Sequence, residues 1–275
     1  MSHNDILLGK STRYFEEYNP KVLFPIARNQ GRSSLALPPF KGYDLWRIYE
    51  LTYLQPNGLP QSVMATLRVP YNSPYLVESK SLKLYLGSFC QTMFGSAEEV
   101  RGLIAHDLED LLDAPIDVQF YPPTVESMPA QMLSGTLLEA EALLKGAELQ
   151  FRTYETDTSL LKMQEHGHKV NETLCTNIFR SLCPVTGQPD YASVEISYIG
   201  EQIDHMALLA YLISFRRHKG FHEQCVERIF MDIHNKLLPD ELTVTACFTR
   251  RGGIDISPVR SNAKTFQCPV RTPRQ

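Results

Sequence analysis

The stretch YLGSF, residues 85–89, returns as YLISF at residues 211–215, an offset of 126 along the chain. Continued without a gap, the same offset keeps apolar residues opposite apolar residues well beyond the two motifs. The matched pairs are Val100 with Val226, Leu103 with Ile229, Ile104 with Phe230, Leu111 with Leu237, Leu112 with Leu238, and Val118 with Val244. Because a chance match of two short motifs would not stay in register over this length, the pattern predicts an internal repeat.

Both copies predict the same helices and the same following strand. In the first copy, Ser96 followed by Glu99 predicts a helix N-terminus with a capping box, and the apolar positions behind it recur with helical period. Another helical stretch precedes this helix, and a short strand-like run follows it. The preceding helical stretches lie at 78–89 and 204–217, and the strand-like runs at 116–121 and 242–249.

A hairpin opens each copy, because proline and glycine of the kind found in turns separate two strand-like runs. These runs lie at 43–54 and 61–69, and again at 172–182 and 191–199. The predicted fold class is therefore α+β, with β-β-α-α-β-β units near 43–125 and 171–258. We expect an N-terminal domain over 1–125. A second domain over 126–275 would include the segment between the copies.

The composition, with 43% hydrophobic and 21% charged residues, is typical of a soluble globular protein. The net charge of -4 gives no general attraction to nucleic acid or membranes. The first residues contain no apolar core of signal-peptide length, which favours a cytoplasmic location. The six cysteines lack CxxC spacing, which disfavours a zinc site and a disulfide framework. The basic residues from Arg250 onward favour a solvated tail over a phosphate site.

Cys183 is the residue that the repeat does not explain. The two turns match as QPNGLP and CPVTGQP, so Gln55 stands where Cys183 stands in the second copy. A structural cysteine belongs inside an apolar element, whereas a nucleophile must be both positioned and accessible, as at the start of a turn. Asp190, just past the turn, can fold back toward Cys183. Spacing alone leaves two interpretations open: a nucleophile with its acid, or a packed cysteine with a turn-capping aspartate.

The string VESKSLKLYL, residues 77–86, places Glu78, Lys80 and Lys83 at the start of a helix. By periodicity alone this is a solvated helix terminus. The whole string, however, resembles the signature of the NADPH-dependent 7-cyano-7-deazaguanine reductases, the nitrile reductases of the queuosine pathway.

Three further segments strengthen this resemblance. CPVTGQPD at 183–190 resembles the active-site segment of the family, and GFHEQC at 220–225 looks like its substrate-binding element. RRGGIDI at 250–256 is similar to its cofactor-contacting loop. The likeness covers nearly the whole chain and is to the longer, two-module type.

The resemblance implies tandem tunnelling-fold (T-fold) modules, each an antiparallel sheet with two helices, and a homodimer. It implies NADPH-dependent reduction of the nitrile of 7-cyano-7-deazaguanine (preQ0) to 7-aminomethyl-7-deazaguanine (preQ1). A covalent thioimidate would form on Cys183, with Asp190 as proton donor and His222 assisting. The implied substrate-binding residues are Val77, Glu78, Ser79, His222 and Glu223. The implied NADPH-binding residues are Ser79, Lys80, Arg251 and Gly252, and no metal is implied.

Two other functions remain open at this point. A cyclohydrolase- or pterin-type enzyme of the same fold would need a metal, and HGH at 166–168 is the tightest histidine pair in the sequence, although loop histidines are the simpler interpretation. A non-catalytic purine-binding or tRNA-binding module is the second alternative. The acidic balance and the lack of a basic patch interleaved with aromatic residues argue against direct nucleic-acid binding. Nothing in the sequence indicates a membrane partner.

Overall fold

The computed structural model describes residues 14–32, 38–146 and 149–275, which form a mixed α+β structure. The chain divides into two compact units. Unit 1 contains the described residues up to Pro38, together with Tyr43–Pro129 and Arg250–Ile256. Unit 2 contains Pro39–Gly42, Ala130–Thr249 and Ser257–Gln275.

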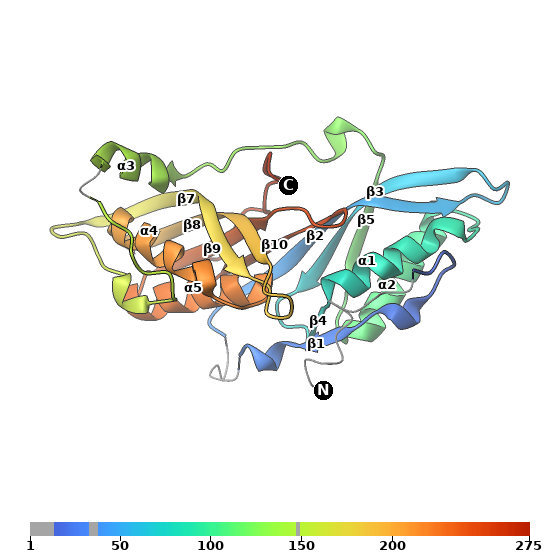
Figure 1. Cartoon of the computed structure of the whole chain (residues 1–275), viewed down its shortest axis with the longest axis horizontal. Helices are drawn as coiled ribbons and strands as arrows, with labels where there is room; N and C mark the ends of the chain where they lie inside the picture. Colours follow the sequence, from blue (N-terminus) through green and yellow to red (C-terminus); the bar gives the residue numbers. More distant parts are fainter. Residues whose placement is uncertain (1–13, 33–37, 147–148) are drawn as a thin grey trace. The chain divides into compact units, whose positions relative to one another are not determined.

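Unit 1 contains an antiparallel sheet and two α-helices (Figure 1). Its strands are β1 (Pro25–Ala27), β2 (Lys41–Leu54), β3 (Pro60–Pro70), β4 (Tyr75–Val77) and β5 (Asp117–Tyr121). Its helices are α1 (Ser79–Gly87) and α2 (Ala97–Leu112), with short 3-10 turns at Pro20–Val22, Arg28–Gln30, Ser88–Gln91 and Val125–Ser127. The sheet order is β5-β3-β2, and β1 pairs separately with β4.

The core of unit 1 lies between α2, α1 and the sheet. Val100, Ile104, Leu108 and Leu112 form the buried face of α2, which confirms the predicted apolar face. The Ser96 hydroxyl accepts a hydrogen bond from the Glu99 N–H at 3.1 Å, as in a capping box. The Glu99 carboxylate, however, accepts from the N–H of the residue before Ser96, so the reciprocal bond is displaced by one position.

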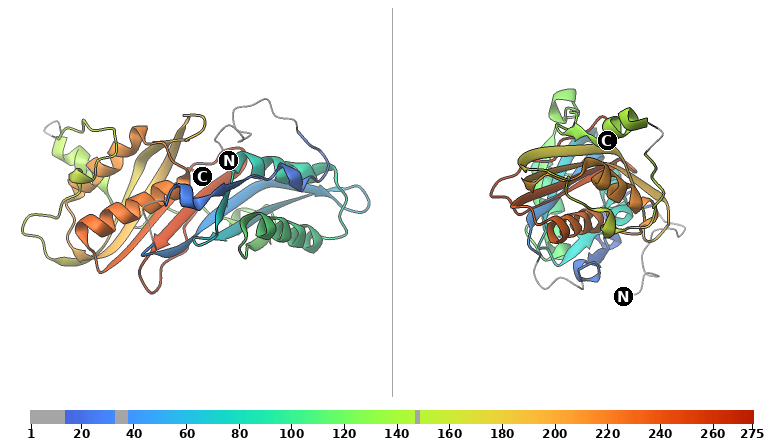
Figure 2. Two further views of the ribbon diagram at one scale, coloured as in Figure 1. Left: turned by 90° about the horizontal axis from the view of Figure 1, so that it is seen from below. Right: turned by 90° about the vertical axis from the view of Figure 1, so that its left-hand side faces the viewer.

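Unit 2 contains a mostly antiparallel set of strands with two α-helices on one of its faces (Figure 1; Figure 2). Its strands are β6 (Thr136–Leu137), β7 (Lys169–Leu182), β8 (Pro189–Glu201), β9 (Glu241–Phe248) and the Ser257–Ser261 part of β10 (Ile254–Ser261). Its helices are α3 (Leu138–Lys145), α4 (His205–Ser214) and α5 (His222–Leu237), with 3-10 turns at Thr158–Leu160 and Phe215–Arg217. The order is β10-β9-β8-β7-β6, antiparallel except for β6, which runs parallel to β7.

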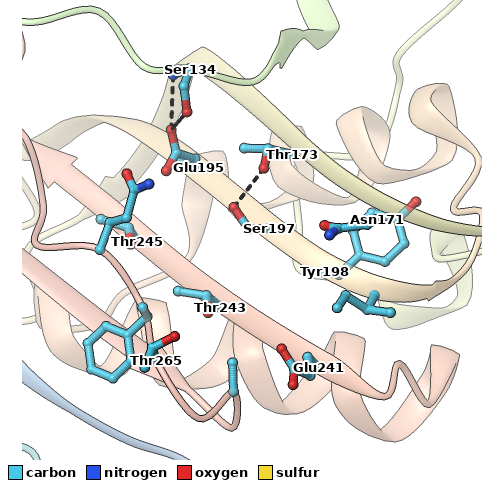
Figure 3. Close-up of a pocket in the computed structure, with 14 residues that line it drawn as sticks. Ser134, Asn171, Thr173, Glu195, Ser197, Tyr198, Glu241, Thr243, Thr245 and Thr265 are labelled. Atoms are coloured by element: carbon cyan, nitrogen blue, oxygen red, sulfur yellow. Dashed lines mark hydrogen bonds between the residues drawn. The ribbon is translucent and has the colours of Figure 1, made fainter.

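The face of this sheet opposite the helices carries polar side chains. Along β8, Val194 and Ile196 are buried, whereas Glu195 and Ser197 point to the other face, as the two-residue period of a strand requires. Together with threonines of β7 and β9 they line a pocket of about 240 Å³ (Figure 3).

Helices α1 and α4, the first helix in each copy of the repeat, make the same contacts. The carboxylate of Glu78 caps α1, and the carboxylate of Asp204, 126 residues later, caps α4. The Tyr85 hydroxyl donates to Asp107 at 2.5 Å. In unit 2 the corresponding bond runs from Tyr211 to Asp232 at 2.7 Å. The internal repeat is therefore present in side-chain contacts as well as in element order.

The hairpins of the two units also match in detail. Each ladder ends on a leucine opposite a proline and carries one register shift on the way. These are Leu54 opposite Pro60 with the shift between Ile48 and Leu51, and Leu182 opposite Pro189 with the shift between Thr176 and Phe179. The hairpins predicted from the sequence are confirmed.

The second helices match with an offset of 125, one residue less than the ungapped alignment. The N-caps are Ser96 and Phe221, and the C-caps Asp113 and Leu238 both adopt left-handed backbone, with φ of 50° and 49°. The predicted pairs within these two helices are therefore wrong by one residue, and Leu112 and Leu238 show it, because Leu112 is fully buried and Leu238 is 74% exposed. The second copy has one residue fewer between its helices, and the apolar pattern alone did not reveal this deletion.

The first copy departs from the predicted β-β-α-α-β-β series. In the described part of unit 1, β5 is followed by the turn Val125–Ser127 and by no further strand before Pro129. Pro122, Pro123 and Pro129 lack the N–H that a ladder requires, which explains the missing strand. Residues Arg250–Ile256 join unit 1 instead.

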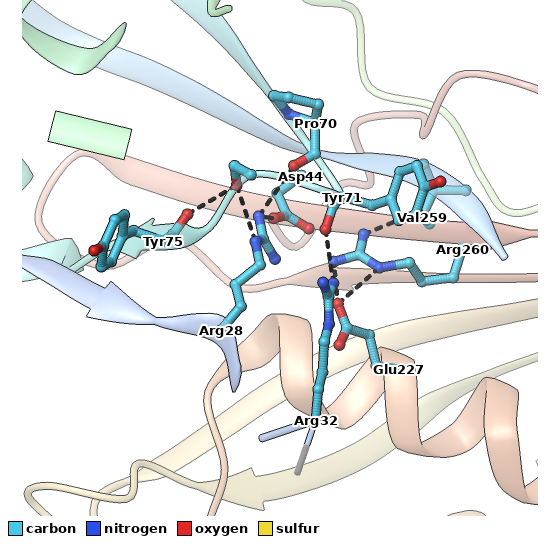
Figure 4. A network of polar contacts seen from close by, with 10 residues as sticks. Arg28, Arg32, Asp44, Pro70, Tyr71, Tyr75, Glu227, Val259 and Arg260 are labelled. Atoms are coloured by element: carbon cyan, nitrogen blue, oxygen red, sulfur yellow. Dashed lines mark hydrogen bonds and ion pairs between the residues drawn. The ribbon is translucent and has the colours of Figure 1, made fainter. Parts of the chain in front are cut away.

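The basic stretch after Arg250 is not the solvated tail that its charge favoured. It contains β10, and the side chain of Arg260 in that strand is fully buried. Arg260 donates to Glu227 of α5, with Nη2 and Nε at 2.7 and 3.0 Å from Oε1 (Figure 4). Its guanidinium also lies over the Phe40 ring. A buried counter-ion and an aromatic face make the cation tolerable inside unit 2.

Glu227→Gln tests this buried pair. The change keeps the shape of the side chain but leaves the Arg260 guanidinium without its counter-ion, so we expect a loss of about 3–5 kcal/mol in unfolding free energy. Urea denaturation would measure it. Glu98→Gln is the matched control, because Glu98 pairs with Arg101 on the surface, and it should leave the midpoint close to that of the parent protein. Equal shifts in the two variants would contradict the argument from burial.

Candidate active site

Cys183 directly follows β7 and shapes the hairpin turn through its backbone. Its N–H donates to the Gln188 carbonyl at 2.8 Å, and its carbonyl accepts from Gly187 at 2.9 Å. Gly187 has φ of 69°, which favours glycine at this point of the turn. Cys183 is 8% exposed, so the thiol is largely enclosed although it lies at the end of a strand.

The first copy indicates how the side chains of Cys183 and Asp190 are directed. Gln55 follows β2 as Cys183 follows β7, and Gln61 is the second residue of β3 as Asp190 is of β8. The Gln55 amide donates to the Gln61 carbonyl oxygen at 3.0 Å. Side chains at these two positions therefore meet on one face of the hairpin end. By the repeat, we expect the thiol and the carboxyl of Asp190 to share the corresponding face.

Backbone hydrogen bonds fix the segment between α4 and α5 against this hairpin end. Leu182 donates to the His218 carbonyl at 2.8 Å and accepts from the Gly220 N–H at 3.1 Å. The Gln224 side chain then accepts from the Phe221 N–H at 3.1 Å and so helps to start α5. The first residue of α5 is His222, which is thereby placed beside the hairpin.

His222 and Asp190 form a polar pair. The His222 Nε2 lies 3.4 Å from the Asp190 Oδ1, and the exposed fractions of the two side chains are 16% and 6%. The imidazole packs against the Phe248 ring at the end of β9, with centroids 4.0 Å apart. Glu223, the next residue of α5, is buried in the first helical turn. The structure thus brings Asp190 and His222 into contact, with Cys183 at the same hairpin end and Glu223 next to His222 in α5.

Gly220 stands where the first copy has an aromatic residue. Its counterpart is Phe94, whose N–H donates to Leu54 as that of Gly220 donates to Leu182. The Phe94 ring packs on Phe89 with centroids 5.5 Å apart. In unit 2 a side chain here would crowd the His218 ring, because an added Cβ would lie 3.1 Å from its Nε2.

Cys225, in the first turns of α5, is a buried thiol with a raised pKa. Burial, with the nearby Asp190 and Glu223 carboxylates, raises the pKa of the Cys225 thiol to about 12, although a hydrogen bond with Ser181 acts to lower it. Cys225 is therefore held as a neutral thiol at neutral pH. Burial likewise raises the pKa of Cys175 to about 11. Neither thiol suits a nucleophilic role.

The other predicted residues lie in unit 1 around the start of α1. Val77 ends β4, and the Glu78 carboxylate accepts from the Lys80 and Ser81 N–H groups at 2.9 and 2.7 Å. Burial raises the Glu78 pKa, while these two N–H groups lower it. Glu78 is 2% exposed, so helix capping is the role that its contacts show directly. Ser79 is exposed at the first position of the helix.

The loop that carries Arg251 and Gly252 lies against the same helix. Gly252 has φ of 57°, and an added Cβ would lie 2.6 Å from the Lys83 side chain. The guanidinium of Arg250 lies over the Tyr49 ring, 3.7 Å from its centroid. Lys83 of α1 and the arginines of the loop lie in unit 1, and the Glu50 carboxylate lies beside Gly253 of the same loop.

The alternative functions depend on other features, namely the histidine pair at 166–168, a metal-binding group or a membrane span. His166 and His168 are exposed in the turn before β7. Among the described side chains, no group of three His, Cys, Asp or Glu could hold a metal ion. Within the same ranges, no helix has both the length and the apolar character needed to cross a bilayer.

Sequence reasoning missed three neighbours of the predicted residues. His218 and Phe248 have no motif of their own, although the alignment of Gly220 with Phe94 would have drawn attention to the segment around His218. Lys83 was noted only for its charge. Its contact with Gly252 joins segments far apart in the sequence, and no spacing rule predicts it.

The hairpin end thus carries a largely enclosed thiol and an aspartate–histidine pair, residue types that covalent thiol chemistry can use. Comparison with known proteins gives the family. Residues 14–120 match the family model described as "Nitrile reductase, 7-cyano-7-deazaguanine-reductase N-term". Residues 189–267 match the model described as "QueF-like protein".

The NADPH-dependent 7-cyano-7-deazaguanine reductase of Paraburkholderia phymatum is 45% identical over 276 residues, covering 98% of this chain and 97% of that protein. Proteins of the same name from Burkholderia lata and Paraburkholderia xenovorans are 48% and 47% identical, over 93% of this chain and 92% of theirs. The chain therefore belongs to the family of NADPH-dependent 7-cyano-7-deazaguanine reductases, and the resemblance seen in its sequence is confirmed.

His218 makes the stability of the protein depend on pH. Burial, with the Arg228 charge, lowers its pKa to about 4 from 6.5. Between these values the unfolded chain binds a proton that the native ring does not, so stability is lost as pH falls from 6.5 to 4. Partial exposure reduces the effect to about 1–2 kcal/mol.

His218→Gln should remove this loss in urea titrations at pH 7 and pH 4.5. The matched control is His106→Gln, which changes a histidine that is 68% exposed and should keep the loss. An unchanged pH dependence in His218→Gln would refute the assignment.

Proposed function

We propose that this chain catalyses the NADPH-dependent reduction of the nitrile of 7-cyano-7-deazaguanine to the aminomethyl group of 7-aminomethyl-7-deazaguanine, a step of queuosine tRNA modification. The observation that carries the proposal is the 45% identity over nearly the full length of a relative with that named activity. The geometry around Cys183 supports it, because covalent catalysis needs a positioned thiol with a proton donor at hand.

The first chemical step is addition of the Cys183 thiolate to the nitrile carbon. A carbon–sulfur bond forms, one π bond of the nitrile breaks, and the nitrogen takes a proton. The product is a thioimidate, which is a better hydride acceptor than a nitrile. Cys183 is favoured over Cys225 because the Cys225 thiol is held neutral by its raised pKa.

The Asp190–His222 pair supplies the proton in this proposal. The Asp190 Oδ1 and the His222 Nε2 lie 3.4 Å apart, and in this proposal Asp190 gives a proton to the nitrogen as sulfur adds, with His222 assisting. After the first hydride transfer, the carbon–sulfur bond breaks. This step frees Cys183 and leaves an imine for the second reduction.

The residues of unit 1 fit the cofactor. Lys80, with Arg251 on the loop beside Lys83, would hold the phosphates, and the bare backbone of Gly252 permits close approach. NADPH, when bound, supplies the hydride, and two equivalents account for the four-electron change from nitrile to amine. Ser79 at the start of α1 offers its hydroxyl and N–H on the same side of the helix.

The deazapurine would be recognised by carboxylates. Its amide N–H and exocyclic amine donate from one edge, and a carboxylate accepts from both, which suits Glu223 and Glu78. Two of the lone-pair sites of Glu78 already serve the cap of α1, so the substrate would use the remaining ones. Val77 and His222 complete the proposed contacts.

The proposal extends to the architecture. Matching elements in units 1 and 2 support tandem T-fold modules, with the division near residues 125 and 126 that the sequence predicts. A cytoplasmic homodimer that binds no nucleic acid directly is part of the same proposal. Sedimentation at several concentrations would test the dimer.

Cys183→Ala tests the nucleophile. Protein incubated with the cyano substrate and without NADPH should gain the mass of one substrate, and this adduct should be absent in Cys183→Ala because the attacking sulfur is gone. Intact-mass spectrometry measures it. Cys225→Ala is the matched control and should keep the adduct. An adduct that persists in Cys183→Ala but is lost in Cys225→Ala would reverse the assignment.

Asp190→Asn separates proton donation from turn capping. Asparagine keeps volume and capping capacity, so stability should change by at most about 1 kcal/mol. Without a carboxyl proton, substrate-dependent NADPH oxidation should fall on the order of 10²-fold or more. Asp157→Asn is the control, because Asp157 caps a turn and lies at no predicted site. If Asp190→Asn forms the adduct and oxidises NADPH as fast as the parent protein, Asp190 is not the proton donor, and His222 is the next candidate.

A further inference from the structure

Gln275 is a buried glutamine of unit 2 whose side-chain amide is bonded at both ends. It is 4% exposed. Its Nε2 donates to the Phe248 carbonyl at 3.1 Å and to the Ser257 hydroxyl at 3.0 Å. Its Oε1 accepts from the Thr272 N–H at 2.9 Å and from the Thr272 hydroxyl at 3.4 Å. Because a carbonyl only accepts and a backbone N–H only donates, these partners fix the orientation of the amide.

The amide occupies a gap that the sequence of β10 creates. The β9–β10 register runs from Ser261 opposite Thr243 to Val259 opposite Thr245. The next residue of β10 is Pro258, which has no N–H to continue the ladder. Phe248, the last residue of β9, lies beyond this point, and its buried carbonyl needs another donor. The Gln275 amide supplies that donor and bridges the two strands.

Phe248 connects Gln275 to the candidate site, because its carbonyl accepts from Gln275 and its ring packs against His222. Its ring is 1% exposed and forms the surface on which the His222 imidazole rests, with centroids 4.0 Å apart and planes at 31°. The distance from His222 to Asp190 is 3.4 Å, at the long end for a hydrogen bond. A small shift of Phe248 would therefore change the distance between the His222 Nε2 and the Asp190 Oδ1.

We propose that Gln275 is a positioning residue for the reaction. It fixes the backbone of Phe248, and through the Phe248 ring it holds the His222 imidazole beside Asp190. The catalytic consequence rests on the proposed function, whereas the chain from Gln275 to His222 rests on contacts within unit 2 alone.

Gln275→Glu tests the proposal with little change in volume. The variant keeps an acceptor for Thr272 but places an oxygen against the Phe248 carbonyl, so the two repel. We expect kcat for substrate-dependent NADPH oxidation to fall about 10-fold, with KM for NADPH unchanged, since the cofactor residues lie in unit 1. Gln267→Ala, a change at an exposed glutamine of the same segment, is the matched control and should keep the parent values.

A second readout follows His222 directly. In carbon–proton spectra of histidine-labelled protein, the imidazole signal lost in His222→Gln identifies the residue. That signal should shift in Gln275→Glu and stay in place in Gln267→Ala. If Gln275→Glu does not fold, Gln275→Met keeps the length without the charge and should give the same shift and the same fall in kcat.

The outcomes separate this proposal from the proposed function. An unshifted His222 signal in a folded Gln275 variant would overturn the positioning role, whether or not its melting temperature falls. Parent kcat in such a variant would overturn it as well, and so would failure of both Gln275 variants to fold, which would mark a purely structural residue. If the parent protein itself oxidises no NADPH with the cyano substrate, the proposed function fails, and the His222 signal still decides the positioning.

Discussion

Two backbone hydrogen bonds at Leu182 hold the candidate site together. Through them, the residue at the end of β7 donates to His218 and accepts from Gly220. Cys183 comes directly after Leu182, and His222 comes two residues after Gly220, so the bonds bring a hairpin end and a helix start to one place. Because only main-chain atoms take part, side chains on either segment can change without moving the other. The backbone arrangement at the candidate site therefore does not depend on the side chains that the site carries.

Unit 1 shows the same scaffold with other side chains. Leu54 makes the two equivalent bonds to the segment before α2. The positions of the thiol and the carboxyl hold Gln55 and Gln61, and Phe94 replaces the glycine. These three residues line a pocket of about 360 Å³. An amide pair can bind by hydrogen bonds, but it offers neither a nucleophile nor an acid, so the difference between the copies is one of chemistry on equivalent backbone.

The sequence was sufficient for elements whose signals are local. Helix faces such as that of Val100 and Ile104 follow from apolar period, and the hairpin ends follow from proline and glycine. Signals that depend on contacts across the chain were missed. The one-residue slip at Leu238 leaves the apolar pattern nearly unchanged, and the burial of Arg260 depends on a glutamate in another element. The partners of Gln275 depend on a ladder that Pro258 interrupts, which no periodicity records.

The short strand β6 has a consequence for the behaviour of the protein in concentrated solution. It pairs with β7 at Leu174 and Cys175 and covers part of the outer edge of the unit 2 sheet. Gly135, just before it, lies so close that an added Cβ would be 2.8 Å from the Thr173 carbonyl oxygen. A bulkier residue there would push the segment away and expose unpaired N–H and C=O groups of a long strand, which recruit strands of other chains. Resistance to aggregation thus depends on a glycine outside the predicted catalytic and ligand-binding residues.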